Sequence, residues 1–202
     1  MYSQNNEEQF ILKYFHSKPK GTFLDIGAND GITLSNSHAL ALNGWSGLLF
    51  EPSKTASNKA NELYKDNLSV KVYQIAVTDF NGESTMHESG THLNQGDTSL
   101  LSTLQLMETK RWVNETFTPV QVETWDFKTL MKKSRTNVFN FITIDAEGYD
   151  YIILEQIDLT AVGCEMICIE HNGVEIDKYI AYCAGYGMKE VMRNAENLIM
   201  AL

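Results

Sequence analysis

Hydrophobic and polar residues alternate along this chain in blocks whose period changes from the helical to the extended pattern and back. The first block, residues 5–15, gathers large apolar side chains on one helix face, and the apolar run 22–26 predicts a buried strand. Further helices are predicted at 35–43, with Ser35 as the N-cap, and at 54–65, 126–133, 148–157 and 174–184. Further strands are predicted at 47–51, 70–77, 119–123, 138–144, 164–170, 188–192 and 198–202. This alternation indicates an α/β fold with a mostly parallel sheet, closed by an antiparallel pair at the C-terminal end.

The stretch 22–31 carries the most informative chemistry in the sequence. An apolar run delivers Asp25 and is followed at once by a glycine-containing turn. In open α/β sheets ligands bind outside the carboxyl ends of the strands, so this turn is a candidate binding site. Gly27 would let the backbone approach a ligand closely, while Asp25, Asn29 and Asp30 would offer acceptors.

The order of residues in this turn distinguishes between two cofactors. A dinucleotide site favours Gly-x-Gly-x-x-Gly facing a pyrophosphate, whereas acids stand here where a phosphate would be repelled. S-adenosylmethionine carries a sulfonium and an ammonium, both cations, and suits the acidic turn. Glu51 ends the next apolar run about 20 residues further on, where a Rossmann-type fold holds ribose hydroxyls. An NAD-dependent oxidoreductase is the alternative, and helix capping by Asp25 with a solvated Glu51 is the simpler structural explanation.

A second acidic centre is expected at the ends of two later strands. Strand 138–144 leads into Asp145, and strand 164–170 leads into Glu170, His171 and Asn172. One role for this centre is general base catalysis, with His171 preferred because its pKa lies near neutrality, or with Asp145. The other is a divalent cation held by Asp145, Glu170 and His171 or Asn172, although a histidine departs from the oxygen ligands that hard cations prefer. Purely structural pairing is a third possibility.

Periodicity fades between 80 and 116, where glycine, serine, threonine and asparagine are common. Long irregular inserts in compact domains are usually functional. This one follows a strand and would fold over a cofactor, with Asp97 and Ser99 as candidate contacts and Trp112 as a candidate platform for a sugar ring. A hairpin with a loop that touches no ligand is the alternative.

Composition limits the classes of partner. The net charge is −10, from 16 basic and 26 acidic residues, which disfavours nucleic acids and anionic membrane surfaces. No apolar run has the length of a membrane span, the start of the chain is polar, and the three cysteines form no paired pattern. We therefore expect a single domain over residues 1–202 in the cytoplasm; the oligomeric state is left open.

Several motifs, in order along nearly the whole chain, resemble the FkbM-type methyltransferases. They are Tyr2-Ser-Gln, Thr22-Phe-Leu-Asp-Ile-Gly-Ala-Asn-Asp-Gly31, Ser35-Asn36, Gly44-Trp-Ser-Gly47, Phe50-Glu-Pro52, Ala76-Val-Thr-Asp79 and Ile144-Asp-Ala-Glu-Gly148. The resemblance implies a Rossmann-like class I methyltransferase fold, with a mostly parallel seven-stranded sheet, helices on both faces and an antiparallel C-terminal strand. It also implies S-adenosylmethionine as methyl donor, S-adenosylhomocysteine as product, and methylation of oxygen, often on a sugar.

On this interpretation the cofactor contacts follow from the matching motifs. Asp25, Gly27, Asn29 and Asp30 would position the methionyl part, and Glu51 would hold the ribose. Ile75 and Ala76 would meet the adenine, and the remaining motif positions expected at the cofactor are Ala28, Ser35, Asn36 and Pro52.

The predicted activity is O-methylation of a sugar hydroxyl, such as that of a deoxyhexose, in a glycan or glycoconjugate. The Asn/Asp-Pro-Pro-Tyr/Phe motif common in enzymes that methylate nitrogen is missing after strand 138–144, which favours oxygen. The alternatives are a metal-assisted O-methyltransferase acting on a small phenol or natural-product alcohol, and a non-catalytic binding protein on the same fold.

Overall fold

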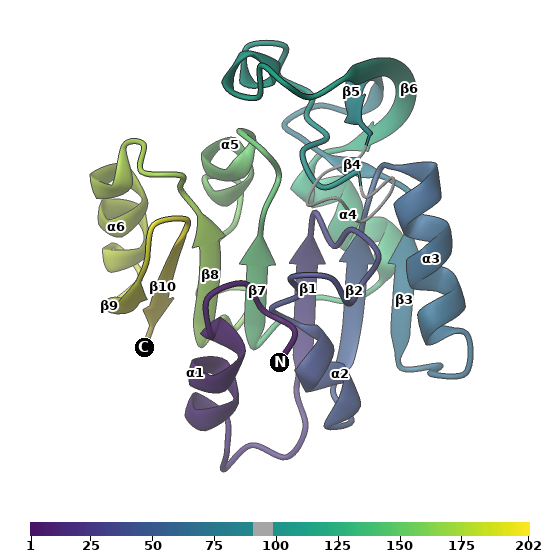
Figure 1. Cartoon of the computed structure of the whole chain (residues 1–202). Coiled ribbons are helices and arrows are strands. Elements are labelled where there is room, and N and C mark those ends of the chain that lie inside the picture. The colour runs from purple at the N-terminus through teal and green to yellow at the C-terminus, as the bar shows by residue number, and fades with distance from the viewer. Residues whose placement is uncertain (91–98) are drawn as a thin grey trace.

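A seven-stranded sheet forms the centre of the computed structural model, which describes residues 1–90 and 99–202. Its strand order is β3-β2-β1-β7-β8-β10-β9, and β10 runs antiparallel to both neighbours while the other pairings are parallel (Figure 1). The strands are β1 Thr22–Ile26, β2 Ser46–Phe50, β3 Val70–Tyr73, β7 Phe141–Ile144, β8 Met166–Glu170, β9 Lys189–Arg193 and β10 Asn197–Ala201. The predicted mostly parallel sheet with an antiparallel C-terminal strand is confirmed.

Helices cover both faces of this sheet because successive residues of each strand point to opposite sides. On one face Leu24 and Ile26 pack with α4 (Phe127–Ser134), α5 (Asp150–Leu154) and α6 (Ile176–Ala184). On the other face Phe23 packs with α1 (Glu7–Tyr14), α2 (His38–Leu42) and α3 (Lys54–Tyr64). β1 is therefore apolar on both sides, as a central parallel strand requires.

A second, three-stranded sheet of order β4-β6-β5 corrects two of the predictions. The predicted strand 70–77 is two strands, because the chain turns after Tyr73, where the Ile75 N–H donates to the Tyr73 carbonyl at 3.0 Å. Its second half, β4 (Ala76–Val77), pairs with β6 (Phe117–Trp125) rather than with the central sheet. The start of the region predicted to be irregular is the regular strand β5 (Gly82–Ser89), antiparallel to β6.

Helices α2 and α5 begin later than predicted, each for a reason visible in the local backbone. Helix α2 begins at His38 rather than at 35; the Ser35 hydroxyl still accepts the Ser37 and His38 N–H groups, so it organises the entry to the helix. Helix α5 begins at Asp150 because Glu147 and Gly148 have φ angles of 46° and 99°, which no right-handed helix accommodates.

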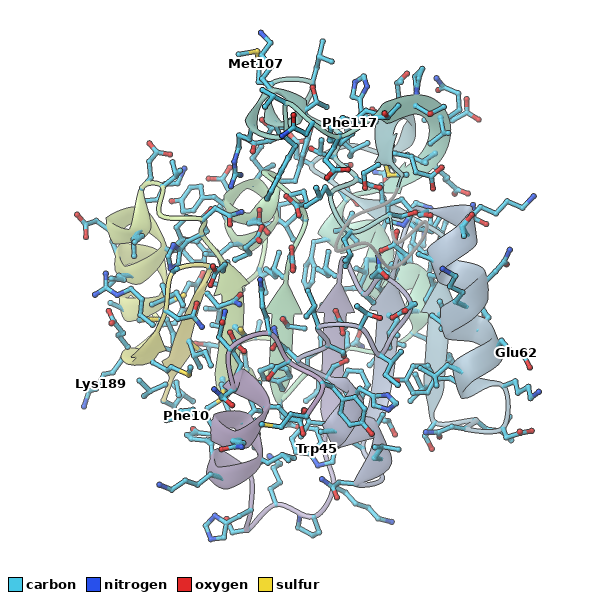
Figure 2. All side chains as sticks on the ribbon, viewed as in Figure 1. Phe10, Trp45, Glu62, Met107, Phe117 and Lys189 are labelled. Atoms are coloured by element: carbon cyan, nitrogen blue, oxygen red, sulfur yellow. The ribbon has the colours of Figure 1, made fainter. Side chains whose placement is uncertain are left out.

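The smaller sheet lies over the ends to which the arrowheads of β1 and β2 point (Figure 1). The 3-10 helix η1 (Glu108–Arg111) lies at the same end, and Met107 and Phe117 are found there, whereas Trp45 lies toward the opposite end of the strands (Figure 2). No helix in the described part of the chain is long and apolar enough to cross a membrane. The carboxyl edge of the central sheet is thus enclosed from above.

Candidate active site

A cavity of about 430 Å³ lies at this enclosed edge. Its walls are the loops that follow β1, β2, β7 and β8, together with parts of β4, β5 and the segment around η1. Cavities of a few hundred cubic ångströms hold cofactor-sized ligands. The position is the one at which an open α/β sheet binds its ligand, as the sequence predicted.

Asp25 lies next to the end of β1 and lines the cavity. Its Oδ2 accepts a hydrogen bond from Ser37 Oγ at 2.5 Å. Burial raises the pKa of Asp25 to about 6, and the Ser37 bond opposes this in part. Asp25 therefore places a nearly buried carboxyl, ionised at neutral pH, at the floor of the cavity.

The structural reason for glycine at position 27 differs from the predicted one. Its φ is +83°, and a Cβ at this position would lie 1.6 Å from the Asp145 carbonyl oxygen. The immediate reason for glycine is therefore the close approach of the turn after β1 to the end of β7. This contact brings the two predicted acidic centres together, and Gly27 with Ala28 still lines the cavity.

Glu51 joins the loops that follow β1 and β2. Its Oε1 accepts the Ser53 N–H at 2.7 Å and its Oε2 accepts the Asn29 N–H at 2.9 Å. Burial raises the pKa of Glu51 to about 7, although both backbone N–H groups act to lower it. A carboxylate has about four acceptor positions, so Glu51 can still accept from a ligand's hydroxyl groups.

The structure does not bring Asp30 to the cavity. Its Oδ1 accepts the Ile32 and Thr33 N–H groups at 3.0 and 2.7 Å, and its Oδ2 accepts the Thr33 hydroxyl at 2.7 Å. Asp30 is therefore an acceptor that folds its own turn, as aspartate commonly does in loops. The predicted contact between Asp30 and the methionyl part lacks structural support.

Asn36 and Ser35 line the cavity on the α2 side. Asn36 Nδ2 lies 3.4 Å from Thr143 Oγ1, while the buried Asn36 Oδ1 has no hydrogen-bond partner among the described residues. Buried acceptors are nearly always paired. A ligand that donates hydrogen bonds, such as an ammonium group, would complete this one.

Another part of the cavity wall is apolar. Ile75 and Ala76 line the cavity at the junction of β3 and β4, and Met86 of β5 joins them there. Pro52 lines the cavity beside Glu51, and Ser99 lines it with its hydroxyl 3.1 Å from Ser53 Oγ. Asp97, the remaining predicted cofactor contact, lies outside the described residues.

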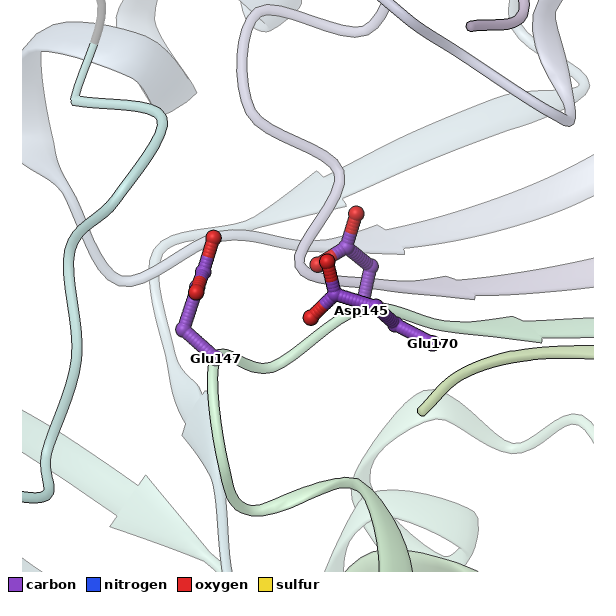
Figure 3. Close-up of side chains that lie close together, drawn as sticks. All are labelled: Asp145, Glu147 and Glu170. Atoms are coloured by element: carbon purple, nitrogen blue, oxygen red, sulfur yellow. The ribbon is translucent and has the colours of Figure 1, made fainter. Parts of the chain in front are cut away.

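Three carboxylates, which we call the carboxylate cluster, also line the cavity. Asp145 follows β7, Glu147 lies in the next turn and Glu170 ends β8 (Figure 3). One oxygen from each lies within 4.8 Å of one from each of the others. The predicted convergence of two strand ends is present, because β7 pairs with both β1 and β8.

The environment of the carboxylate cluster disfavours full ionisation. Asp145 is open to the cavity but surrounded by protein, and burial, with the negative charges of Asp150 and Asp25, raises its pKa to about 7. Burial first, and then the other carboxylates of the cluster, raise the pKa values of Glu147 and Glu170. Arg111 acts in the opposite direction but pairs with Glu108 at 2.7 Å. The cluster is thus a proton-binding or cation-binding group.

His171, the predicted preferred base, is not part of the cavity. Its Nδ1 accepts the Gly173 N–H at 2.8 Å, its ring is buried, and the residue does not line the cavity. Burial lowers the pKa of His171. The reason is positional: β8 ends at Glu170, and the chain turns away immediately afterwards. The structure therefore does not place His171 at the cavity with Asp145 and Glu170, whereas Asn172 does line the cavity.

Glu147, Arg111 and Asp150 are site residues that sequence reasoning missed. Asp150 accepts the Ala146 and Gly148 N–H groups at 2.7 and 3.0 Å and so holds the turn that carries Glu147. The acid-x-acid spacing of Asp145 and Glu147 was a usable signal. Arg111 gave none, because it reaches the cavity from η1, which no pattern had predicted.

The electrostatics of the cavity fit a cationic ligand. Among the described lining residues, Asp25, Glu51, the carboxylate cluster and Glu196 are acidic, and Arg111 alone is basic. A pyrophosphate would be repelled here, whereas a sulfonium and an ammonium would be attracted. The charges of the lining residues therefore suit S-adenosylmethionine and do not suit a dinucleotide.

The fold and the site are those of the class I S-adenosylmethionine-dependent methyltransferases. The seven-stranded sheet and the cavity at the carboxyl ends of its strands are the features that place the protein in this class. The sequence model of the Methyltransferase FkbM domain matches residues 25–188. The chain belongs to the FkbM methyltransferase family and is therefore an S-adenosylmethionine-dependent methyltransferase. This excludes the alternative of an NAD-dependent oxidoreductase. No curated relative matches the sequence.

Solved structures agree with this fold. The METTL16 methyltransferase domain superposes with a TM-score of 0.54 at 12% identity, covering 97% of this chain and 65% of that one. Precorrin-6y C5,15-methyltransferase from Geobacter metallireducens gives 0.51 at 9% identity, covering 99% and 92%. A methyltransferase from Geobacter sulfurreducens gives 0.52 at 9% identity, covering 100% and 80%. The chain thus spans slightly less than two thirds of the METTL16 domain, and at these identities the likeness extends to the fold alone.

Proposed function

We propose that this methyltransferase acts on oxygen, transferring the donor's methyl group to a sugar hydroxyl in a glycan or glycoconjugate. The observation that carries the proposal is the carboxylate cluster, which shares one cavity with the donor-site residues Asp25 and Glu51. A sugar hydroxyl is a very weak acid, so its attack on the methyl group needs a group that accepts its proton. The sugar itself rests on the family resemblance, and Trp112 at the cavity offers a ring to stack on.

S-adenosylmethionine supplies a methyl group on a positively charged sulfur. Around it, Asp25 and the acceptor Asn36 Oδ1 favour the cationic methionyl part, and Glu51 accepts from the ribose hydroxyls. Ile75, Ala76 and the other apolar residues at this end exclude water from the adenine.

Asp145 is the proton acceptor in this proposal. It is the member of the carboxylate cluster most open to the cavity, and it lies beside the turn after β1. As the O–C bond forms and the C–S bond breaks, the electron pair stays on sulfur and the hydroxyl proton passes to Asp145. Its raised pKa, about 7, suits a general base at neutral pH.

Asp145→Asn tests this assignment because the amide keeps the shape and cannot take the proton. We expect turnover to fall by ~10²–10⁴-fold, the usual range for loss of a general base. Calorimetry should still detect binding of S-adenosylhomocysteine to this variant, since Asp25 and Glu51 are intact. Transfer from labelled donor to a panel of sugars, measured by mass spectrometry, gives the rate.

Asp66→Asn is the matched control, because Asp66 is exposed just beyond α3. It should retain wild-type turnover. An Asp145→Asn variant as active as this control would reject Asp145 as the proton acceptor.

A small phenol or natural-product alcohol is the second candidate acceptor, with a metal ion assisting. What favours it is the all-oxygen composition of the carboxylate cluster, in which His171 takes no part. Including phenols in the acceptor panel separates the two candidates.

A further inference from the structure

The carboxylate cluster is unusual because its charge is not balanced by the described protein groups around it. Three carboxylates lie together, two of them buried, and the one basic residue among the described lining, Arg111, already pairs with Glu108. At neutral pH such a group either holds protons or holds a cation, because like charges at these distances cannot all remain ionised without compensation.

Glu170 provides an independent indication of a missing ligand. Its side chain is only 9% exposed, and its buried Oε2 has no hydrogen-bond partner among the described residues. An unpaired buried carboxylate oxygen costs about 1–3 kcal/mol or more. Because this residue is one of the three that converge, its unpaired Oε2 points to an occupant of the cluster.

The spacing of the oxygens suits a hard divalent cation. Ligand oxygens on opposite sides of Mg²⁺ lie about 4.2 Å apart, and those around Ca²⁺ about 4.8 Å apart, twice the metal–oxygen distance. The cluster brings its three oxygens within 4.8 Å of one another. With no histidine or cysteine in the set, magnesium, calcium or manganese is favoured over zinc or copper.

The turn that carries Glu147 is already held in place. Thr103 Oγ1 donates to the Glu147 carbonyl at 2.7 Å, and Asp150 accepts two N–H groups of the same turn. Glu147 has a φ of 46°, a left-handed conformation that costs about 1–2 kcal/mol for a residue with a side chain. The surrounding contacts therefore fix Glu147 in a position that its own backbone does not favour, as expected of a ligand residue.

We propose that Asp145, Glu147 and Glu170 form a binding site for one hard divalent cation, with the remaining coordination positions open to the cavity. Ion binding is independent of the acceptor. Its catalytic consequence rests on the proposed function: the ion would polarise the acceptor hydroxyl, and a carboxylate of the cluster would take its proton. The competing explanation is a proton shared between Asp145 and Glu170, which lie close enough to hydrogen bond.

Binding of Mn²⁺ to the full chain, followed by its electron paramagnetic resonance signal without donor or acceptor, tests the site. We expect one saturable site that Mg²⁺ or Ca²⁺ displaces, and the more effective competitor identifies the preferred ion. Glu147→Gln and Glu170→Gln should each weaken Mn²⁺ binding at least ~10-fold, since each replaces a charged carboxylate with a neutral amide, a weaker ligand for a cation. Glu83→Gln, an exposed acid on β5, should bind Mn²⁺ like the wild type.

Folding of each variant is checked by circular dichroism, and Glu147→Asp provides a second variant that keeps the charge but moves it. We expect Glu147→Asp to bind Mn²⁺ more weakly than the wild type while melting as a folded protein. No saturable binding in the wild type, or equal binding in folded Glu147→Gln, overturns the site and leaves the shared proton. A wild-type protein that methylates oxygen but does not bind Mn²⁺ would contradict this inference alone. A wild-type protein that binds Mn²⁺ but does not methylate oxygen would contradict the proposed function alone.

Discussion

At the scale of single residues, the site depends on close approach between two turns. Gly27 meets the backbone of Asp145, and that contact fixes the donor-side residues relative to the carboxylate cluster. The acids that result, Asp25 and Glu51, are held by N–H and O–H donors rather than by basic side chains. Their negative charge therefore remains available to a cationic ligand.

Gly27→Ala should destabilise the fold by about 3 kcal/mol or more, because it combines a left-handed backbone with a clash against fixed backbone. Gly187→Ala is the matched control: it has the same φ of +83° and nothing within 4 Å of the added Cβ. We expect it to cost only about 1–2 kcal/mol. Denaturant unfolding measures both, and equal losses would mean that the contact with Asp145 is unimportant.

The raised pKa values of Asp25 and Glu51, about 6 and about 7, make donor binding depend on pH. Both groups take up protons as the pH falls through these values, so the cavity loses negative charge. The affinity for S-adenosylmethionine should therefore fall between about pH 8 and pH 6. S-adenosylhomocysteine lacks the sulfonium charge and should show a smaller fall, which calorimetry at several pH values would measure. Parallel pH profiles for the two would contradict an electrostatic role.

At the scale of elements, the site is assembled from two sheets. The central sheet presents Asp145 and Glu170 at neighbouring strand ends, and the smaller sheet supplies the apolar wall and the segment that covers the cavity. Thr103, which bridges to His87 of β5, joins the two parts through its hydrogen bond to the Glu147 carbonyl.

Thr103→Val should loosen this junction without changing its volume. The variant loses the bond to Glu147 and the one its oxygen accepts from the Gln105 N–H, at a cost of about 1–2 kcal/mol. We expect turnover to fall more than donor affinity, because the turn carrying Glu147 is released while Asp25 and Glu51 are unchanged. Thr85→Val, at an exposed bond to Gln121, is the control. An equal loss of turnover in both variants would argue against Thr103 as a positioning residue.

At the scale of the whole molecule, the sequence predicted the central sheet correctly, and two of the acids that it singled out, Asp25 and Glu51, line the cavity. The reason is that buried parallel strands are apolar on both faces and end in recognisable acid and glycine residues, as at Asp25 and Glu51. Prediction from the sequence failed where contacts between distant segments decide the structure. Nothing in the run 70–77 shows that its two halves join different sheets, and nothing at His171 shows that the chain turns away after Glu170. Arg111 reaches the cavity from a distant segment, which periodicity does not locate.

We propose that this acidic cavity directs the methyl group to a hydroxyl oxygen. The most direct measurement supplies donor carrying a ¹³C-methyl group, together with sugar and phenol acceptors, and reads the carbon chemical shift of the product's methyl group by NMR. We expect an O-methyl signal that is absent with Asp145→Asn. A methyl signal on nitrogen or carbon, or an O-methyl signal of equal strength with that variant, would contradict it.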